Sequence, residues 1–122
     1  MILVDTSVWI DHLRNPDPAL RELLQNQQVI AHPLVRLELA LGSIANREKV
    51  LAAMALLPQG PVANAGELIE LVESRRLYRR GIGVTDLNLL ASALLDRSIS
   101  IWTRDRRLGE IADELQIRSS IN

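Results

Sequence analysis

Hydrophobic residues along this chain form short continuous runs that alternate with helix-spaced patterns. The runs Ile2–Val4 and Ser100–Thr103 are typical of buried strands in a parallel sheet, which are apolar on both faces. Between them, apolar side chains recur at intervals of three and four residues, which predicts amphipathic helices. The predicted helices are Thr6–Leu13, Ala19–Gln25, Pro33–Leu41, a helix capped by Asn46 and running to Leu57, Gly66–Arg80, Thr85–Arg97 and Asp105–Gln116.

Proline and glycine mark the boundaries of these elements. We expect Pro33 to open a helix and Gly42 to end it in the C′ position, while Pro58-Gln59-Gly60-Pro61 stops the next helix. Weaker strand signals lie at Val29–His32, at Val62–Asn64 and at Ile117, where an edge strand is expected. The alternation predicts βαβ units. We therefore expect one α/β domain over residues 1–122, with a short, mostly parallel central sheet flanked by helices in three α/β/α layers.

The composition is that of a soluble globular protein, with 48% hydrophobic and 24% charged residues. The absence of cysteine excludes disulfide scaffolds, thiolate zinc sites and cysteine nucleophiles, and it is compatible with a reducing cytoplasm. The first residues lack the features of a signal peptide, and no apolar run reaches membrane-spanning length. We therefore expect a cytoplasmic protein with no membrane partner.

The net charge of −1 argues against a uniformly basic nucleic-acid-binding protein, but the basic residues are clustered. All except Lys49 are arginines, and many of them fall within Arg75–Arg80 and Arg104–Arg107. Guanidinium groups suit two-pronged contacts with phosphate. The alternative is that each cluster is a solvated face or a set of helix-end charges.

Four acidic residues stand beside apolar segments. Asp5 directly follows the first strand, and Asp105 closely follows Ser100–Thr103. Ligands in open α/β sheets bind at the carboxyl ends of the strands. Glu38 has Leu34 and Leu41 at helical spacing, and Asp86 is likewise followed by apolar residues, so both acids are expected on apolar stripes.

Each acid also has a structural explanation. Asp5, Asp86 and Asp105 stand where helices begin, and Asp is a favoured N-cap. For Glu38, the alternative to a carboxylate cluster is an ion pair with an arginine from a neighbouring element. Capping does not account for Glu38 or for the acid that ends the clearest strand, so we favour a single carboxylate cluster. Such a cluster suits Mg²⁺ or Mn²⁺, because these ions prefer oxygen ligands and relieve the repulsion between carboxylates.

Three segments resemble motifs of the PIN-domain ribonucleases, and specifically of the VapC-like toxins of bacterial toxin–antitoxin pairs. They are Ile2-Leu3-Val4-Asp5-Thr6-Ser7-Val8-Trp9-Ile10, Gly81-Ile82-Gly83-Val84-Thr85-Asp86, and Ile101-Trp102-Thr103-Arg104-Asp105-Arg106-Arg107-Leu108. The resemblance covers essentially the whole chain. It departs from many relatives at Arg107-Leu108, where they have Asp-Phe, and at Leu89-Leu90-Ala91, where they have Ile-Ala-Ala.

The resemblance implies a metal-dependent endoribonuclease that cuts RNA such as tRNA or rRNA. By position, the catalytic and metal-binding acids are Asp5, Glu38, Asp86 and Asp105, the last at a position where relatives vary between Asp and Asn. Hydroxyl groups that would orient these acids belong to Thr6, Ser7 and Thr103. The implied cofactor is Mg²⁺ or Mn²⁺, and the implied partners are a cognate VapB-like antitoxin and a second copy in a homodimer.

Arginines would neutralise the phosphate charge of the substrate. The candidate RNA contacts are Arg76, Arg80, Arg104 and Arg106. The stretches Leu34–Leu41 and Val50–Leu57 are apolar on more than one face. Their apolar area has two alternative roles: it packs in the core, or it forms a surface that binds a second copy or an antitoxin helix.

Other functions are less compatible with the sequence. A metal-free ribonuclease needs paired histidines, and the chain has only His12 and His32, each expected to be structural or exposed. A receiver domain usually needs adjacent acids and a later strand-end lysine, whereas Lys49 lies in a predicted helix. A haloacid-dehalogenase-like phosphatase needs Asp-x-Asp, which Asp5-Thr6-Ser7 does not provide. The main alternative is a catalytically silent PIN-like module that binds RNA or protein.

Overall fold

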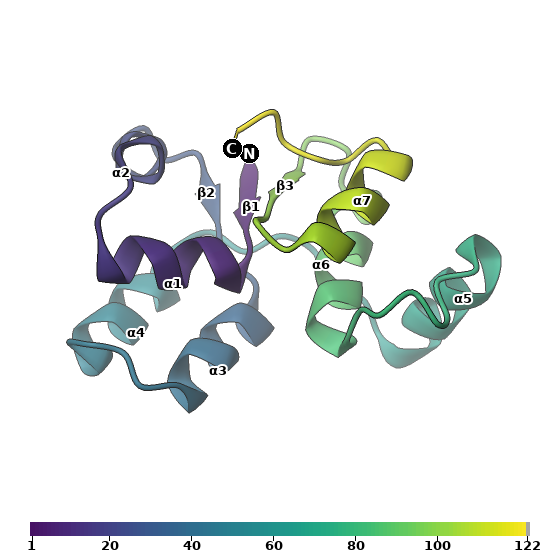
Figure 1. Cartoon of the computed structure of the whole chain (residues 1–122), viewed down its shortest axis with the longest axis horizontal. Coiled ribbons are helices and arrows are strands. Elements are labelled where there is room, and N and C mark those ends of the chain that lie inside the picture. The colour runs from purple at the N-terminus through teal and green to yellow at the C-terminus, as the bar shows by residue number, and fades with distance from the viewer. Residues whose placement is uncertain (122) are drawn as a thin grey trace.

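The structure is a computed structural model, and it describes residues 1–121. The described chain contains a three-stranded sheet and seven helices (Figure 1). The strands are β1 (Ile2–Val4), β2 (Val29–Ile30) and β3 (Ser100–Trp102). The helices are α1 (Thr6–Arg14), α2 (Pro18–Gln25), α3 (Pro33–Leu41), α4 (Arg47–Ala55), α5 (Ala65–Arg75), α6 (Val84–Leu95) and α7 (Arg106–Glu114).

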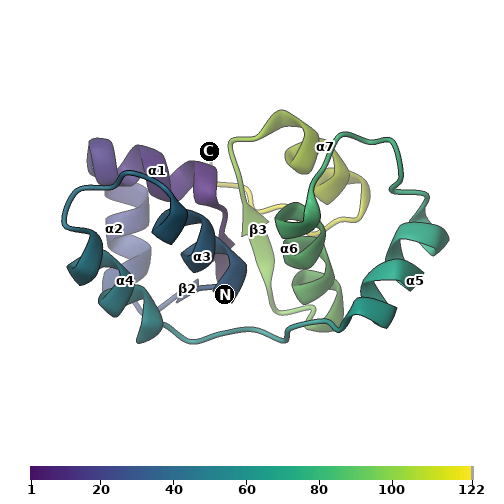
Figure 2. The same cartoon turned by 90° about the horizontal axis from the view of Figure 1, so that it is seen from below.

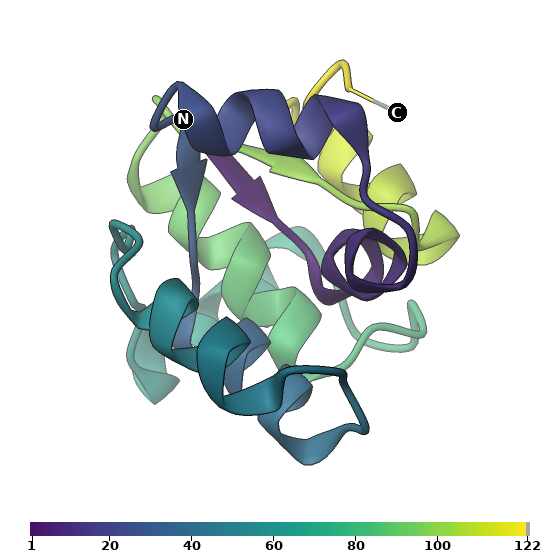
Figure 3. The same ribbon diagram turned by 90° about the vertical axis from the view of Figure 1, so that its left-hand side faces the viewer.

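The sheet is parallel and has the strand order β2-β1-β3. β1 is central, with Leu3 paired to Ile30 on one side and to Ile101 on the other. Because all three strands run in the same direction, their carboxyl ends meet at one edge, and α1 and α7 begin beside it. The short strands diverge from one another in Figure 3, as in a twisted sheet. The expected α/β class with a parallel sheet flanked by helices is confirmed.

The hydrophobic core surrounds the sheet and α6. In α6, Asn88–Ala93 is a run of six buried residues, and this helix packs against β3, α3 and α5. Both tryptophans belong to the core, with Trp102 fully buried and Trp9 5% exposed. Helix α5 has no buried residue and lies at the margin of the molecule, farthest from α1–α4 in both Figure 1 and Figure 2. The core therefore fixes the positions of β1, β3 and α6, the elements that carry or precede Asp5, Asp105 and Asp86.

Several predicted boundaries are wrong. Val62–Asn64 forms no strand; Ala31 pairs instead with Gln59 in an isolated parallel bridge. The helix predicted over Gly66–Arg80 ends at Arg75, because Arg76 adopts a left-handed conformation with φ of 53° and the chain turns to bury Leu77.

Two predicted cap residues also behave differently from expectation. Asn46 makes no side-chain cap bond and has a φ of 54°, a left-handed conformation that Asn tolerates better than most residues. Gly42 is extended, with a φ of −90°, so the end of α3 does not require glycine's conformational freedom. Near the carboxyl terminus, the predicted pairing at Ile117 is reduced to one parallel bridge between Ile101 and Arg118. None of the described helices has the length and hydropathy that a membrane-spanning segment needs.

The central position of α6 generates a stability prediction. Leu90 is fully buried, so Leu90→Ala should lower the free energy of unfolding by about 2–5 kcal/mol, because it removes apolar contacts and leaves a cavity. Leu41, which is 80% exposed, provides the matched control, and Leu41→Ala should change stability by less than about 0.5 kcal/mol. Urea unfolding followed by circular dichroism measures both, and equal effects would contradict the assignment of the core.

Candidate active site and metal centre

Asp5 is the most enclosed of the four candidate acids. It lies immediately after β1, and its side chain is 4% exposed. Although Asp5 occupies the N-cap position of α1, its side chain makes no cap bond. The Oδ2 atom instead accepts hydrogen bonds from Ser7 Oγ and Thr103 Oγ1, each at 2.7 Å. These two bonds support the prediction that Ser7 and Thr103 orient a carboxylate.

Asp105 joins the same network from the end of β3. Its backbone N–H donates to Thr103 Oγ1 at 3.0 Å, so Thr103 connects the backbone of one acid to the side chain of another. The side chain of Asp105 accepts from the Leu108 N–H at 2.9 Å and caps α7, as the capping alternative predicted. Capping uses Oδ1 and leaves Oδ2 without a hydrogen-bond partner among the described residues.

Glu38 differs from its predicted environment. Its side chain is exposed, whereas the buried positions of α3 are Val35 and Leu39. The prediction of an apolar stripe was wrong because the flanking Leu41 is itself 80% exposed. The carboxylate is nevertheless held in place, since Thr6 Oγ1 donates to Glu38 Oε1 at 2.5 Å. This bond joins the start of α1 to α3 next to Asp5.

The pKa of Asp86 is affected by the negative charges of the other three acids. Asp86 lies in the first turn of α6, half-buried, and accepts a long hydrogen bond of 3.5 Å from the Gly83 N–H. Burial raises the pKa of Asp86 to about 6; the negative charges of Asp5, Asp105 and Glu38 act in the same direction, and the Gly83 amide opposes them. The three other acids are therefore close enough to Asp86 for their charges to act on its carboxylate.

The donor set fits a hard divalent cation. Within residues 1–121, no three acidic or histidine side chains are arranged to ligate one ion directly. Mg²⁺, however, is commonly held by one or two carboxylates, with water and substrate phosphate as its remaining ligands. The Oδ1 atom of Asp5 has no hydrogen-bond partner among the described residues, because both hydroxyl groups bond to Oδ2. Asp5 therefore offers one carboxylate oxygen to an ion, and the roles of Asp86, Glu38 and Asp105 as further ligands stay predictions.

The four arginines predicted to contact RNA have different environments. Arg104 bonds to Asp11 Oδ2 at 2.8 Å and to Asp17 Oδ2. Arg80 makes a two-pronged bond to Glu114, at 2.7 and 3.1 Å. Two other arginines are more accessible: Arg106 has an 86% exposed side chain 3.5 Å from Glu110, and Arg76 is exposed without a carboxylate partner among the described residues.

Both histidines have structural roles. His12 Nδ1 accepts from the Asp17 N–H at 2.9 Å, and His32 Nδ1 accepts from the Leu34 N–H at 3.0 Å, capping α3. Burial lowers the pKa of each imidazole. A ring nitrogen that accepts a backbone N–H is not protonated, so these histidines do not form the acid–base pair that a metal-free ribonuclease needs.

Sequence reasoning missed three residues near the candidate site. Asp11 and Asp17 bind Arg104, and no sequence pattern connects residues so far apart. Arg14, at the end of α1, lines a groove of about 520 Å³ together with Glu38 and Ile44. Arg14 could not be identified from the sequence, because a single basic residue at a helix end is already explained by its favourable interaction with the helix dipole.

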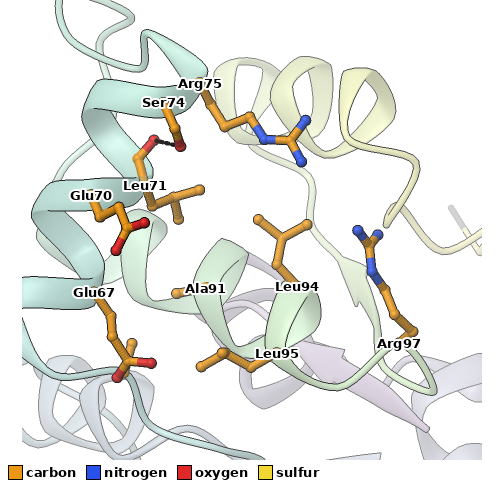
Figure 4. Close-up of a pocket in the computed structure, with 10 residues that line it drawn as sticks. Glu67, Glu70, Leu71, Ser74, Arg75, Ala91, Leu94, Leu95 and Arg97 are labelled. Atoms are coloured by element: carbon orange, nitrogen blue, oxygen red, sulfur yellow. Dashed lines mark hydrogen bonds between the residues drawn. The ribbon is translucent and has the colours of Figure 1, made fainter.

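A separate cavity of about 320 Å³ lies between α5 and α6 (Figure 4). Leu71 and Leu94 point into it, and charged side chains, among them Glu70 and Arg97, surround it. None of the four candidate acids lines this cavity. The candidate chemistry therefore belongs to the carboxyl edge of the sheet.

The family model of the PIN domain matches residues 2–114. The chain belongs to the PIN-domain family, as the three motifs predicted. Within that family it is similar to Ribonuclease VapC32 of Mycobacterium tuberculosis, in strains CDC 1551 / Oshkosh and ATCC 25618 / H37Rv. The identity is 54% over 108 residues, which is 88% of this chain and 87% of the relative. The predicted resemblance to VapC-like proteins is thereby confirmed.

The raised pKa of Asp86 predicts a pH-dependent stability difference. The folded-state pKa, about 6, lies above the ordinary value of 3.8, so the ionised carboxylate destabilises the fold above pH 6 and this penalty disappears as the pH falls toward 4. In metal-free protein at pH 7.5, Asp86→Asn should raise the free energy of unfolding by about 1–2 kcal/mol, allowing for solvent screening.

Urea unfolding between pH 4.5 and 8 measures this difference. The exposed residue Glu70 provides the control, and Glu70→Gln should leave stability almost unchanged across the range. An Asp86→Asn protein that is no more stable than wild type at pH 7.5 would contradict the raised pKa of Asp86.

Proposed function

We propose that this protein is a metal-dependent endoribonuclease and the toxin of a toxin–antitoxin pair. The proposal is supported by the hydrogen bonds through Thr103 that link Asp5 to Asp105 beside the strand ends. It is also supported by the charges of Asp5, Asp105 and Glu38, which contribute to the raised pKa of Asp86, about 6. The 54% identity to a protein named as a ribonuclease supports RNA as the substrate. The proposed cofactor is Mg²⁺ or Mn²⁺, and tRNA or rRNA is the proposed target.

The chain's own residues would prepare the site for hydrolysis. Ser7 and Thr103 orient the carboxylate of Asp5, because each donates a hydrogen bond to it. Thr6 does the same for Glu38. When bound, a divalent cation would neutralise phosphate charge and activate water for in-line attack on the phosphodiester. The expected products carry a 5′-phosphate and a 3′-hydroxyl.

Arginines are proposed to bind the RNA backbone. Arg106 and Arg76 are the most accessible of the four predicted contacts. Arg80 and Arg104 would have to exchange a carboxylate partner for phosphate. Each arginine that contacts phosphate should contribute to a decrease in RNA affinity as the salt concentration rises.

A homodimer and a VapB-like antitoxin are the proposed protein partners. The described residues leave apolar surface outside the core in two places. On α3 and α4, Leu41 and Leu56 are 80% and 87% exposed. On α5 and α6, Ile69 and Val84 are 65% and 70% exposed. We assign the α5–α6 surface to the second copy, because α5 buries none of its residues within this chain despite its apolar sequence.

Cleavage of total cellular RNA by the purified, antitoxin-free protein tests the proposed activity. Wild type should give discrete products with Mg²⁺ or Mn²⁺ and none with EDTA. Asp5→Ala should lower the cleavage rate by at least about 100-fold, because it removes the best-oriented carboxylate from the site. Glu70→Gln, which changes an exposed acid on α5, should cleave at the wild-type rate.

The same assay distinguishes the alternative function. Metal-dependent products from a folded Asp5→Ala protein would overturn the mechanism. A folded wild type that binds RNA but never cleaves it would identify a catalytically silent PIN-like binding module.

The dimer assignment predicts the effect of a charge on the α5–α6 surface. Ile69→Glu should convert the dimer into a monomer, because a carboxylate would be buried without a partner at the interface. Leu56→Glu places the same charge on the α3–α4 surface and should leave the dimer intact. Light scattering after size-exclusion chromatography measures the mass of each protein. A monomeric wild type, or a dimeric Ile69→Glu variant, would contradict the assignment.

A further inference from the structure

Arg104 connects three elements around the candidate site. Its guanidinium bonds to Asp11 on α1 at 2.8 Å and to Asp17, the N-cap of α2. The same group lies over the indole of Trp102, 5.5 Å from the ring centroid, at a distance typical of cation–π contacts. Arg104 itself stands between Thr103 and Asp105, in the segment that joins β3 to α7. We call this set of contacts the Arg104 strap.

The backbone of Arg104 reaches the carboxylate network directly. Its N–H donates to Ser7 Oγ at 3.1 Å, and Ser7 Oγ donates to Asp5 Oδ2 at 2.7 Å. Because the hydroxyl oxygen already accepts from Arg104, its single proton is directed toward Asp5. Thr103 supplies the second bond to the same Oδ2 atom. With Oδ2 saturated in this way, Oδ1 is the oxygen of Asp5 that remains available for an ion.

We propose that Arg104 is a positioning residue of the metal site, which holds the β3–α7 segment against α1 so that Ser7 and Thr103 keep Asp5 in its ion-binding orientation. This inference rests on the proposed function. Arg104 acts through the two hydroxyl groups and does not touch the ion. The strap thereby replaces RNA contact as the role of this arginine.

Charge and burial favour the strap over a phosphate contact. Two carboxylates already face the single cationic charge of Arg104, whose side chain is 30% exposed. Asp17 is only 18% exposed, so RNA binding would leave a partly buried carboxylate without its partner. The neighbouring Arg106, in contrast, is 86% exposed. The guanidinium of Arg104 bonds to the two aspartates through two different nitrogens while it lies over the indole, and a Lys side chain has no such fork.

Two variants separate the strap from an RNA contact. Arg104→Lys keeps the positive charge but removes the two guanidinium nitrogens that bond separately to Asp11 and Asp17. Asp17→Asn removes one carboxylate while its Oδ1 continues to accept from the Ala19 and Leu20 amides that begin α2, so the variant should fold. Arg21→Gln, which changes an exposed arginine on α2, is the control for a change of one unit in net charge near the strap.

Calorimetry with Mn²⁺ alone and fluorescence anisotropy with a labelled RNA give independent readouts. The strap predicts that Arg104→Lys and Asp17→Asn each raise the Kd for Mn²⁺ by about 10-fold, as for other residues that orient metal ligands. In an Asp5→Asn background, which prevents cleavage, both should change RNA affinity by less than about 2-fold. Arg21→Gln should leave the Mn²⁺ affinity unchanged.

A phosphate-binding Arg104 predicts the opposite pattern. Asp17→Asn would then strengthen RNA binding, because it frees the guanidinium, and neither variant would alter the affinity for Mn²⁺. That pattern, or wild-type Mn²⁺ affinity in both folded variants, overturns the strap alone. A wild type that neither binds Mn²⁺ nor cleaves RNA would instead overturn the proposed function, and the strap with it.

Discussion

Repulsion among carboxylates at the carboxyl edge of the sheet is the constraint on which the account of this site depends. A parallel sheet brings the ends of its strands to one edge, and here that edge carries Asp5 and Asp105 from two neighbouring strands. Asp86 reaches the same region from α6, and burial together with the three other acids raises its pKa to about 6. Such an arrangement is unfavourable for the isolated fold at neutral pH. A bound cation would convert the repulsion into attraction.

The hydroxyl groups around Asp5 determine which of its carboxylate oxygens is available to a cation. Ser7 and Thr103 both donate to Oδ2 of Asp5, so the network fixes the rotamer of the carboxylate and leaves its other oxygen free. Thr103 also accepts from the Asp105 N–H and thereby couples two of the acids through one side chain. Short hydroxyl side chains suit this task because they donate to a carboxylate without adding charge to the cluster.

Much of the fold could be predicted from the sequence, and so could the placement of Asp5 and Asp105 beside the ends of neighbouring strands. The runs Ile2–Val4 and Ser100–Thr103 are apolar on both faces, which is a local signal for buried parallel strands. Each candidate acid was found from its position beside an apolar segment. The end of α5 was missed because Leu77 continues the apolar pattern, whereas in the structure the left-handed Arg76 turns the chain and carries Leu77 into the core.

Two features of the site depended on tertiary structure. Glu38 has apolar neighbours in sequence, but its exposure is set by how α3 packs, with Val35 and Leu39 facing inward. The contacts of Arg104 with Asp11 and Asp17 join residues 93 and 87 positions apart, and no local pattern encodes such a pairing. Arginine clusters therefore indicate nucleic-acid contact only where the structure leaves their charge accessible.

Proton release on cation binding tests the central claim most directly. If the cation neutralises the cluster, Asp86 must lose its proton when the ion binds. With a pKa of about 6, Asp86 is half protonated at pH 6 and almost fully ionised at pH 8. Calorimetric titration with Mn²⁺ in buffers of different ionisation enthalpy should therefore show about half a proton released per ion at pH 6 and almost none at pH 8. Equal proton release at both pH values, or no binding at either, would contradict the account.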